Sequence, residues 1–318
     1  VAVGYAAMIV FPACATDLRD AAAVIELFDR AATTLRACPL RRGCTVNLPA
    51  RGRLIATGDI HDNPIHLHKI MKFARLDDSS DHHVVLHEMI HGERLINGMD
   101  FSYRVLAKSA ELVIAHAGQV HPLLSNHDLA QRAGSSISKG AGDSVRMFND
   151  ALEYVFGDDG ESVGEAIGRY IAAFPLALRS ESAEGGGDSE ANESDGEGGI
   201  LCSHSLPAPA MMSSFDLGIL ERELTEDDYA TRRGSAWKMV WGRGHEPGQL
   251  EILAANWKVR LFVIGHERAE TGVEIRGPRL VVLNSDHERA SVLPIDLGAV
   301  PGAYLAALSV MPLAGVAE

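Results

Sequence analysis

The sequence predicts an α/β fold, and two observations about its apolar side chains carry that prediction. In the first half of the chain, short apolar runs alternate with longer segments whose apolar residues recur at helical spacing, which favours parallel strands joined by helices. Beyond residue 199, short apolar runs follow one another more closely, which favours mixed sheets. With 318 residues, the chain is long enough for one large α/β domain or two small ones.

The first helix is expected over residues 16–37, where Leu18, Ile25 and Leu35 belong to an amphipathic pattern. The apolar opening, residues 1–15, lacks a basic leader and indicates a strand or core segment rather than a trimmed signal peptide. Further helices are expected at residues 64–74, 101–110 and most of 144–178. Strands are expected at residues 53–57, 84–87, 112–115, 121–124, 200–203, 259–264, 273–275, 280–283 and 291–294.

The net charge of −14 is unevenly distributed along the chain. Residues 180–199 contain seven acidic side chains and no basic ones, and this polar composition predicts a flexible surface insertion. The overall negative charge disfavours nonspecific binding to nucleic acids. No apolar run reaches about 18 residues, the length that a membrane-spanning helix needs. We therefore expect neither a nucleic acid nor a membrane as a partner.

The four cysteines, Cys14, Cys38, Cys44 and Cys202, do not follow the spacing of a zinc knuckle. Cys38 and Cys44 could form a local pair, but reduced and partly buried thiols are the favoured interpretation. This cysteine usage is typical of a reducing compartment, so we expect the chain to work in the cytoplasm.

Five polar motifs, each with a histidine, follow or interrupt the expected strands. They are Asp59-Ile60-His61, His87-Glu88-Met89-Ile90-His91, Asn126-His127-Asp128, Ser203-His204-Ser205 and Gly265-His266-Glu267. Because α/β folds place their sites at strand ends, we expect these side chains to converge. Oxygen and imidazole donors together are what a divalent metal site needs. A sixth cluster, Asp286-His287-Glu288, could line the same site, but a turn is the favoured interpretation.

A centre of two metal ions has further requirements. It needs a carboxylate that bridges the ions, which lie about 3.5–4 Å apart, and an open position for water. A hydroxide that bridges the ions can then attack phosphorus in line. Taken alone, Asp59-Ile60-His61 or Asn126-His127-Asp128 also fits a capped turn. Five such motifs in one chain favour the metal centre.

The order of the motifs, beginning with Gly58-Asp59-Ile60-His61-Asp62-Asn63, resembles the calcineurin-like metallophosphoesterases. It is most similar to the branch that contains the serine/threonine protein phosphatases and the bacterial diadenosine tetraphosphatases. The resemblance covers about residues 53–295. It implies a single domain over residues 1–318, built as a four-layer α/β/β/α sandwich of two mixed β-sheets flanked by helices.

The resemblance also implies a role for each matching residue. His127 would be the general acid for the leaving alcohol or, alternatively, would stabilise charge, and Asp128 and His91 are grouped with it as catalytic candidates. Arg243 would bind phosphate oxygens, since its planar fork can hold two at once, and Arg94 is a second candidate for that task. The implied metal ligands are Asp59 and His61 for the first ion, Glu88 as the bridge, and Asn126, His204 and His266 for the second ion.

The second motif departs from the family pattern Gly-Asp-x-x-Asp-Arg. Glu88 replaces the bridging Asp, and a longer carboxylate could still bridge two ions at a different spacing. His91 replaces the Asp that orients the catalytic histidine in the family. Here His91 could be a partner of His127, an additional ligand or a packed structural residue. Gly92 stands in place of the family's Arg, and Arg94 lies two residues further on.

The resemblance implies a phosphatase that hydrolyses a phosphate monoester, with a phosphoprotein or a small ester as its partner. Its cofactors would be two metal ions, Mn, Fe or Zn, because this donor set suits them better than Ca²⁺. One alternative is a pyrophosphatase acting on dinucleoside polyphosphates or other nucleotides. The altered second motif motivates another, a non-catalytic module that binds phosphorylated partners.

Overall fold

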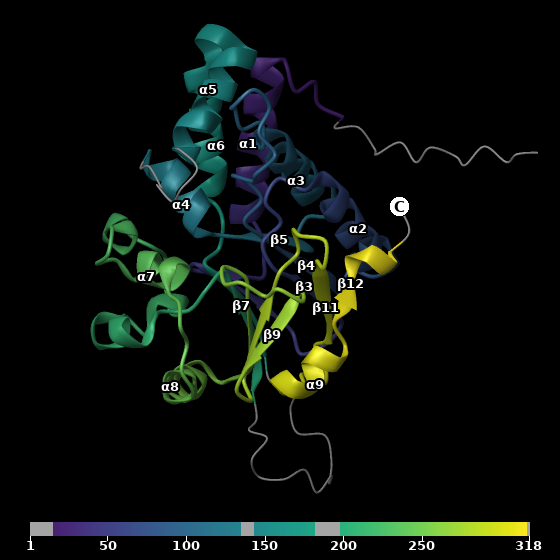
Figure 1. The fold of residues 1–318 in the computed structure, drawn as a ribbon, viewed down its shortest axis with the longest axis vertical. Coiled ribbons are helices and arrows are strands. Elements are labelled where there is room, and N and C mark those ends of the chain that lie inside the picture. The colour runs from purple at the N-terminus through teal and green to yellow at the C-terminus, as the bar shows by residue number, and fades with distance from the viewer. Residues whose placement is uncertain (1–14, 135–142, 182–197, 317–318) are drawn as a thin grey trace, which may run out of the picture.

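The computed structural model describes residues 15–134, 143–181 and 198–316. Its strands form two mixed β-sheets with helices on their outer faces, which confirms the predicted four-layer fold (Figure 1). Several helices lie together in the upper part of this view, above the strands, and four of these helices pack closely along one another. They are α1 (Ala21–Arg36), α3 (Tyr103–Ala115), α5 (Ser144–Phe156) and α6 (Gly160–Ile171).

The larger sheet has seven strands in the spatial order β1, β2, β6, β7, β8, β10, β9. Their bounds are Arg41–Arg42, Thr45–Leu48, Ala177–Ser180, Gly199–Ser203, Val259–Ile264, Leu280–Leu283 and Val273–Arg276 respectively. The neighbours β7, β8 and β10 are parallel, and Ser203 pairs with Ile264 at the end of its strand. The carboxyl ends of β7 and β8 therefore reach the same edge of the sheet.

The smaller sheet has five strands in the spatial order β12, β11, β3, β4, β5. Their bounds are Met311–Pro312, Ser291–Asp296, Arg53–Thr57, His82–His87 and Val120–Leu123 respectively. The neighbours β3, β4 and β5 are parallel, whereas β11 runs antiparallel to β3. Three successive strands thus also end at one edge.

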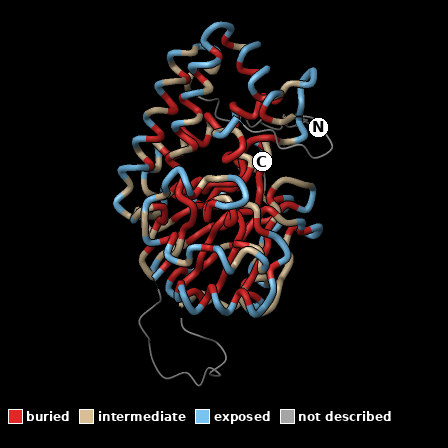
Figure 2. The backbone as a smooth tube through the Cα atoms, turned by 90° about the vertical axis from the view of Figure 1, so that its left-hand side faces the viewer, coloured by how far each residue is buried: buried red, intermediate tan, exposed pale blue. Residues whose placement is uncertain are grey.

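An apolar layer fills the space between the two sheets. Leu54 and Ala56 of β3 pack there against residues of the larger sheet such as Val263. Ile55 lies between them in sequence but packs in the other apolar cluster, with the helices, as the two-residue period of a strand requires. Figure 2 shows these strands as the buried centre of the molecule, with exposed residues concentrated in loops and on outer helix faces.

Several helices begin at capping residues that the sequence supplies. Asp20 accepts hydrogen bonds from the N–H groups of Ala22 and Ala23 at the start of α1. Asn63 caps α2 (Pro64–Ala74), whose first residue is a proline. Helix α4 covers Asn126–Ala133, α7 Ser235–Trp241, α8 Pro247–Trp257 and α9 Ala303–Leu308.

The structure confirms most predicted elements and corrects two. Residues 112–115, predicted as a strand, are the last turn of α3, which uses Val113 to contact the core. A short apolar run fits a buried strand or one face of a helix equally well. Residues 177–178 belong to β6 rather than to the predicted helical segment. Nearly all of the predicted strand or core segment at 1–15, and most of the acidic insertion at 180–199, lie outside the described residues.

Two further expectations concern membranes and cysteines. Within the described ranges, none of the helices combines the length and the apolar character needed to cross a bilayer. Cys38, Cys44 and Cys202 carry free thiols, so the local pair of Cys38 and Cys44 does not form.

Candidate active site

The predicted metal-binding residues follow the carboxyl ends of strands from both sheets, and these ends lie close together. Asp59 and His61 follow β3, Glu88 follows β4, His204 follows β7 and His266 follows β8. Asp59 forms parallel bridges with His87, at the end of β4, and with Asn284, which follows β10 of the other sheet. The carboxyl ends of the two sheets therefore meet at Asp59.

Left-handed backbone is concentrated at this meeting point. In the described parts of the chain, nine residues other than glycine have positive φ, and five of them lie here. They are His61, Asp62, Glu88, His91 and His266, with φ between 39° and 62°. This conformation costs about 1–3 kcal/mol per residue and persists only where the surrounding structure holds it, which is typical of functional sites.

Hydrogen bonds between the loops hold this strained backbone. The N–H of His61 donates to the carbonyl oxygen of Glu88 at 2.8 Å. The N–H of His266 donates to the carboxylate of Asp59 at 2.9 Å. A Cβ atom on Gly265 would lie 2.3 Å from Oδ1 of Asp59, so only glycine permits this close approach. The loop after β8 is thereby fixed against the loop after β3.

One ring nitrogen, Nε2 of His204, has three close partners. It lies 2.6 Å from Oδ1 of Asn126, 2.9 Å from Oε2 of Glu88 and 3.0 Å from Nδ1 of His266. A ring nitrogen offers a single donor or acceptor position, so it cannot satisfy all three. A metal ion can, because each of the four atoms contributes its own lone pair. These four side chains are the ones expected to hold the second ion.

Glu88 belongs to two groups of possible metal ligands. Ligand atoms of Glu88, His204 and His266 lie within 4.8 Å of one another, and those of Asp59, His61 and Glu88 do so as well. Oδ1 of Asp59 and Nδ1 of His61 are buried without a hydrogen-bond partner. Buried polar atoms of this kind need a partner. The donor set therefore fits two metal ions that share Glu88.

The buried charges of the cluster favour a cation. Burial raises the pKa of Glu88, but the nearby His127 and His204 outweigh it and hold that pKa well below its usual range. Burial lowers the pKa of His204, but Asp59 and Glu88 outweigh it and raise that pKa to about 10. A proton on His204 thus supplies positive charge to two buried carboxylates. Burial lowers the pKa of His266 to about 2, so this ring is neutral.

We predict from these pKa values that metal binding releases a proton. A ligating imidazole must be neutral, whereas His204 without metal is protonated below pH 10. The affinity for Mn²⁺ or Zn²⁺ should therefore rise about tenfold per pH unit between pH 6 and 8 for each proton released. Titration calorimetry in buffers of different protonation enthalpy counts these protons. An affinity that does not change with pH would contradict the predicted charge of His204.

His127 and Asp128 occupy different positions at the start of α4. Nε2 of His127 lies 3.3 Å from Oε1 of Glu88, and its side chain is 23% exposed. Asp128 is fully buried, and its carboxylate accepts hydrogen bonds from the N–H and the hydroxyl of Ser125, which close a capping box. Burial raises the pKa of Asp128 to about 6. In this position, Asp128 fixes the helix start that presents His127.

His91 packs beside His127, with 5.4 Å between the ring centroids. Its Nδ1 lies 2.7 Å from Oδ2 of Asp100, and both side chains are buried. His91 belongs to neither group of metal ligands in the described residues, which favours a partner of His127 over an additional ligand. Asp100 was not among the predicted site residues, since an irregular segment of eight residues, 92–99, separates it from His91. The sequence marks Asp100 only as an acidic residue shortly before the start of α3, whose N-cap is Ser102.

The two predicted phosphate-binding arginines contact different loops of the site. Nη1 of Arg243 donates to the carbonyl oxygen of His266 at 2.8 Å, which places the guanidinium beside the second ligand group. Arg94 donates to the carbonyl oxygen of His61 at 2.6 Å and to the carboxylate of Asp286 at 2.8 Å. Arg94 thus clamps the loop that carries His61. Asp286 lies in a bend, as expected, and joins the rim through this contact.

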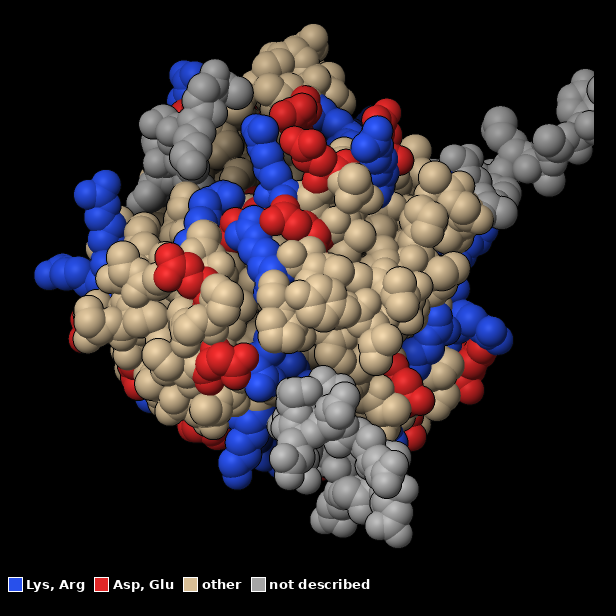
Figure 3. All heavy atoms as spheres, turned by 60° about the horizontal axis from the view of Figure 1, so that its bottom comes forward, with Lys and Arg blue, Asp and Glu red and all other residues tan. Residues whose placement is uncertain are grey.

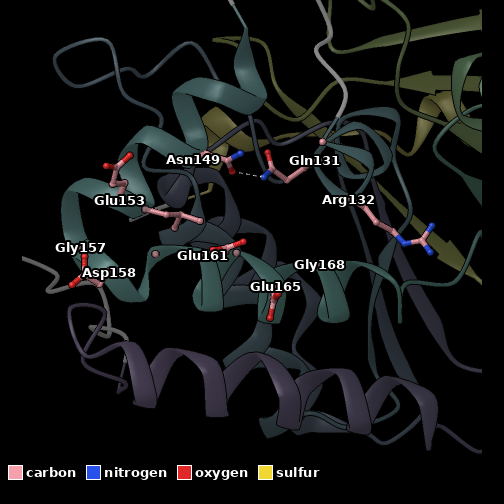
Figure 4. Close-up of a pocket in the computed structure, with 13 residues that line it drawn as sticks. Gln131, Arg132, Asn149, Glu153, Gly157, Asp158, Glu161, Glu165 and Gly168 are labelled. Carbon is pink, nitrogen blue, oxygen red and sulfur yellow. Dashed lines mark hydrogen bonds between the residues drawn. The ribbon is translucent and has the colours of Figure 1, made fainter.

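A cavity of about 760 Å³ lies elsewhere, among α4, α5 and α6 (Figure 4). Acidic side chains such as Glu153, Glu161 and Glu165 border it. None of the predicted site residues lines this cavity. The converging strand-end donors, rather than cavity size, therefore locate the candidate site.

Comparisons with known proteins agree with this fold. No family model and no curated protein sequence matches the chain. A serine/threonine phosphatase from Saccharomyces cerevisiae, similar to human phosphatase PP5, superposes with a TM-score of 0.61 at 16% identity, covering 87% of this chain and 83% of that one. A cold-active protein-tyrosine phosphatase of a psychrophilic Shewanella species superposes with a TM-score of 0.54 at 14% identity, covering 84% and 82%. These likenesses confirm the predicted fold of two mixed β-sheets flanked by helices.

Proposed function

We propose that the chain is a two-metal phosphatase that hydrolyses phosphate monoesters. The observation that carries this proposal is the position of Glu88 in two groups of ligand atoms, each within 4.8 Å. A bridging carboxylate between two ions is the feature that two-metal phosphate hydrolysis needs. The phosphatase fold supports the same conclusion.

The proposed metals are two ions of Mn, Fe or Zn, which suit carboxylate, amide and imidazole donors. When bound, they supply a water of lowered pKa and neutralise charge on the phosphoryl group. We assign Asp59, His61 and Glu88 to one ion, and Glu88, Asn126, His204 and His266 to the other.

The remaining work falls to side chains around the ligands. His127 would donate the proton of its Nε2 to the leaving oxygen. Arg243 would bind phosphate oxygens through the part of its guanidinium that His266 does not engage. Arg243 also lines a surface cavity of about 560 Å³ with Glu267 and Arg276, which gives space for the rest of a substrate.

A monoester is favoured over a pyrophosphate because both neighbouring structures are named as phosphatases of phosphorylated protein side chains. A nucleic acid is not proposed as a partner. On the face in Figure 3, Lys and Arg side chains lie beside Asp and Glu side chains, which would repel a nucleic-acid backbone. The free thiols of Cys38, Cys44 and Cys202 are consistent with the proposed cytoplasmic location.

Replacing Asp59→Asn tests this function directly. Asp59 is a ligand of the first ion and accepts the N–H of His266, so the variant should lose at least about 100-fold in turnover of an aryl phosphate. Steady-state kinetics with added Mn²⁺ measures the loss. Asp296→Asn, at the end of β11, is the control and should keep wild-type turnover. Wild-type turnover in Asp59→Asn would remove the basis for the assignment.

A further inference from the structure

A buried pair formed by His91 and Asp100 lies behind His127. The two side chains are 1% and 2% exposed, and Nδ1 of His91 lies 2.7 Å from Oδ2 of Asp100. The other oxygen of Asp100 accepts the N–H of Ser102 at 2.9 Å. The hydroxyl of Ser102 in turn accepts the N–H of His91 at 3.1 Å. The pair is therefore held at both ends, and Asp100 can only accept hydrogen bonds while it is ionised.

These contacts define the tautomer of His91. A carboxylate at Nδ1 requires a proton on that nitrogen, so in the neutral ring Nε2 carries a free lone pair. Nε2 of His91 is buried without a partner, and so is Nδ1 of His127. The two rings are neighbours, with centroids 5.4 Å apart, and the edge of Phe148 packs on His91 at 5.4 Å. The unsatisfied atoms of the two rings are thus complementary.

We propose that Asp100 is a positioning residue that orients His127 through His91. The first contact, from the Asp100 carboxylate to Nδ1–H of His91, is present in the structure. The second, from Nε2 of His91 to Nδ1–H of His127, forms when the neighbouring rings turn so that these two unsatisfied atoms meet. That last contact directs Nε2–H of His127 toward the leaving oxygen. This proposal rests on the proposed phosphatase function. It also explains how the chain can work with a histidine at position 91. The orienting carboxylate, Asp100, does not contact His127 itself but acts through the ring of His91.

The proton balance of this step is simple. The phosphorus–oxygen bond to the leaving group breaks, and its electron pair takes the proton from Nε2 of His127. The proton on Nδ1 of His127 stays in place, shared with Nε2 of His91. Water supplies the oxygen that replaces the leaving group on phosphorus. One of its two protons stays on the phosphate, and the other restores the proton on Nε2 of His127. No further reactant is needed.

The substitution Asp100→Asn tests the positioning role. The N–H of Ser102 draws the amide oxygen toward itself, so the amide NH₂ faces Nδ1 of His91. His91 must then carry its proton on Nε2, where it opposes Nδ1–H of His127. We expect kcat for an alkyl or phenyl phosphate to fall at least about tenfold, with KM unchanged. For dinitrophenyl phosphate, whose leaving group needs no proton, kcat should change less than about twofold.

A second variant covers the case in which Asp100→Asn does not fold. In His91→Asn, the amide NH₂ still donates to Asp100, but no atom reaches toward His127. It should show the same dependence on the leaving group. Asp228→Asn is the matched control, a buried carboxylate bound to Arg222 and Thr225 outside the site. Its kcat ratio between the two esters should equal the wild-type ratio.

Nitrogen-15 NMR of His91 provides a measurement independent of turnover. It should show a protonated Nδ1 in the wild-type chain and a protonated Nε2 in Asp100→Asn. Equal losses for both esters in Asp100→Asn and His91→Asn, or an unchanged tautomer, would overturn the positioning role while leaving the phosphatase intact. Absence of turnover of both esters by the metal-loaded wild-type chain would overturn the proposed function, and the positioning role with it.

Discussion

Replacing Glu88→Gln should abolish turnover of an aryl phosphate and reduce bound metal from two equivalents per chain to one or none. Glu88 is 2% exposed and belongs to both groups of ligand atoms. A neutral amide has the same length but cannot give a charged oxygen to each of two ions. We expect the loss in kcat to be on the order of 10³-fold or more. Elemental analysis of the purified variant and steady-state kinetics measure the two effects.

Glu111→Gln is the matched control for this experiment. Glu111 lies on α3 and contacts Lys108 and the N–H of Thr16, away from the site. Its metal content and turnover should stay at wild-type values. If Glu88→Gln kept two metal equivalents and full turnover, Glu88 would not be the bridge, and another carboxylate would have to be found.

The variant His127→Ala should lose about 10²–10⁴-fold in kcat on a phenyl phosphate while keeping its metal. His127 lies outside both groups of ligand atoms, and its partly exposed ring faces Glu88 at 3.3 Å. Its removal therefore takes away a proton donor and no ligand. Kinetics with esters of rising leaving-group pKa measure the effect, which should grow with that pKa.

His116→Ala is the control, since His116 caps α3 and lies 3.8 Å from Asp77 at the surface. It should keep wild-type kinetics with every ester. A loss of metal in His127→Ala would make His127 a ligand rather than the acid, and full turnover would exclude both roles.

The sequence predicted where the proposed metal ligands lie because most of them come soon after a largely buried strand. Strands such as Arg53–Thr57 and Val259–Ile264 appear as short apolar runs with the observed boundaries. A polar residue directly after such a run must lie at the strand end. Parallel pairing aligns these ends within each sheet, and the meeting of the two sheets at Asp59 then brings Asp59 and His266 together.

Other parts depend on contacts that no local pattern records. The apolar run at 112–115 is compatible with either a strand or a helix. Only its packing within the fold shows that it belongs to α3. Asp100 contacts His91 because the irregular segment between them folds back on itself. The two residues are not separated by a helical or strand repeat, so the sequence pattern does not predict this contact. Asp128 belongs to a polar motif, but its capping box with Ser125 shows that it supports His127 from inside the helix start.

The most direct test of a two-metal centre is the metal content of the wild-type chain. The chain would be stripped with a chelator, reloaded with Mn²⁺, Fe²⁺ or Zn²⁺, and analysed for metal and for turnover of an aryl phosphate. We predict two equivalents per chain, with turnover lost on stripping and restored when both equivalents return. A chain that binds no metal, or that turns over the ester equally well after stripping, would contradict the shared role of Glu88.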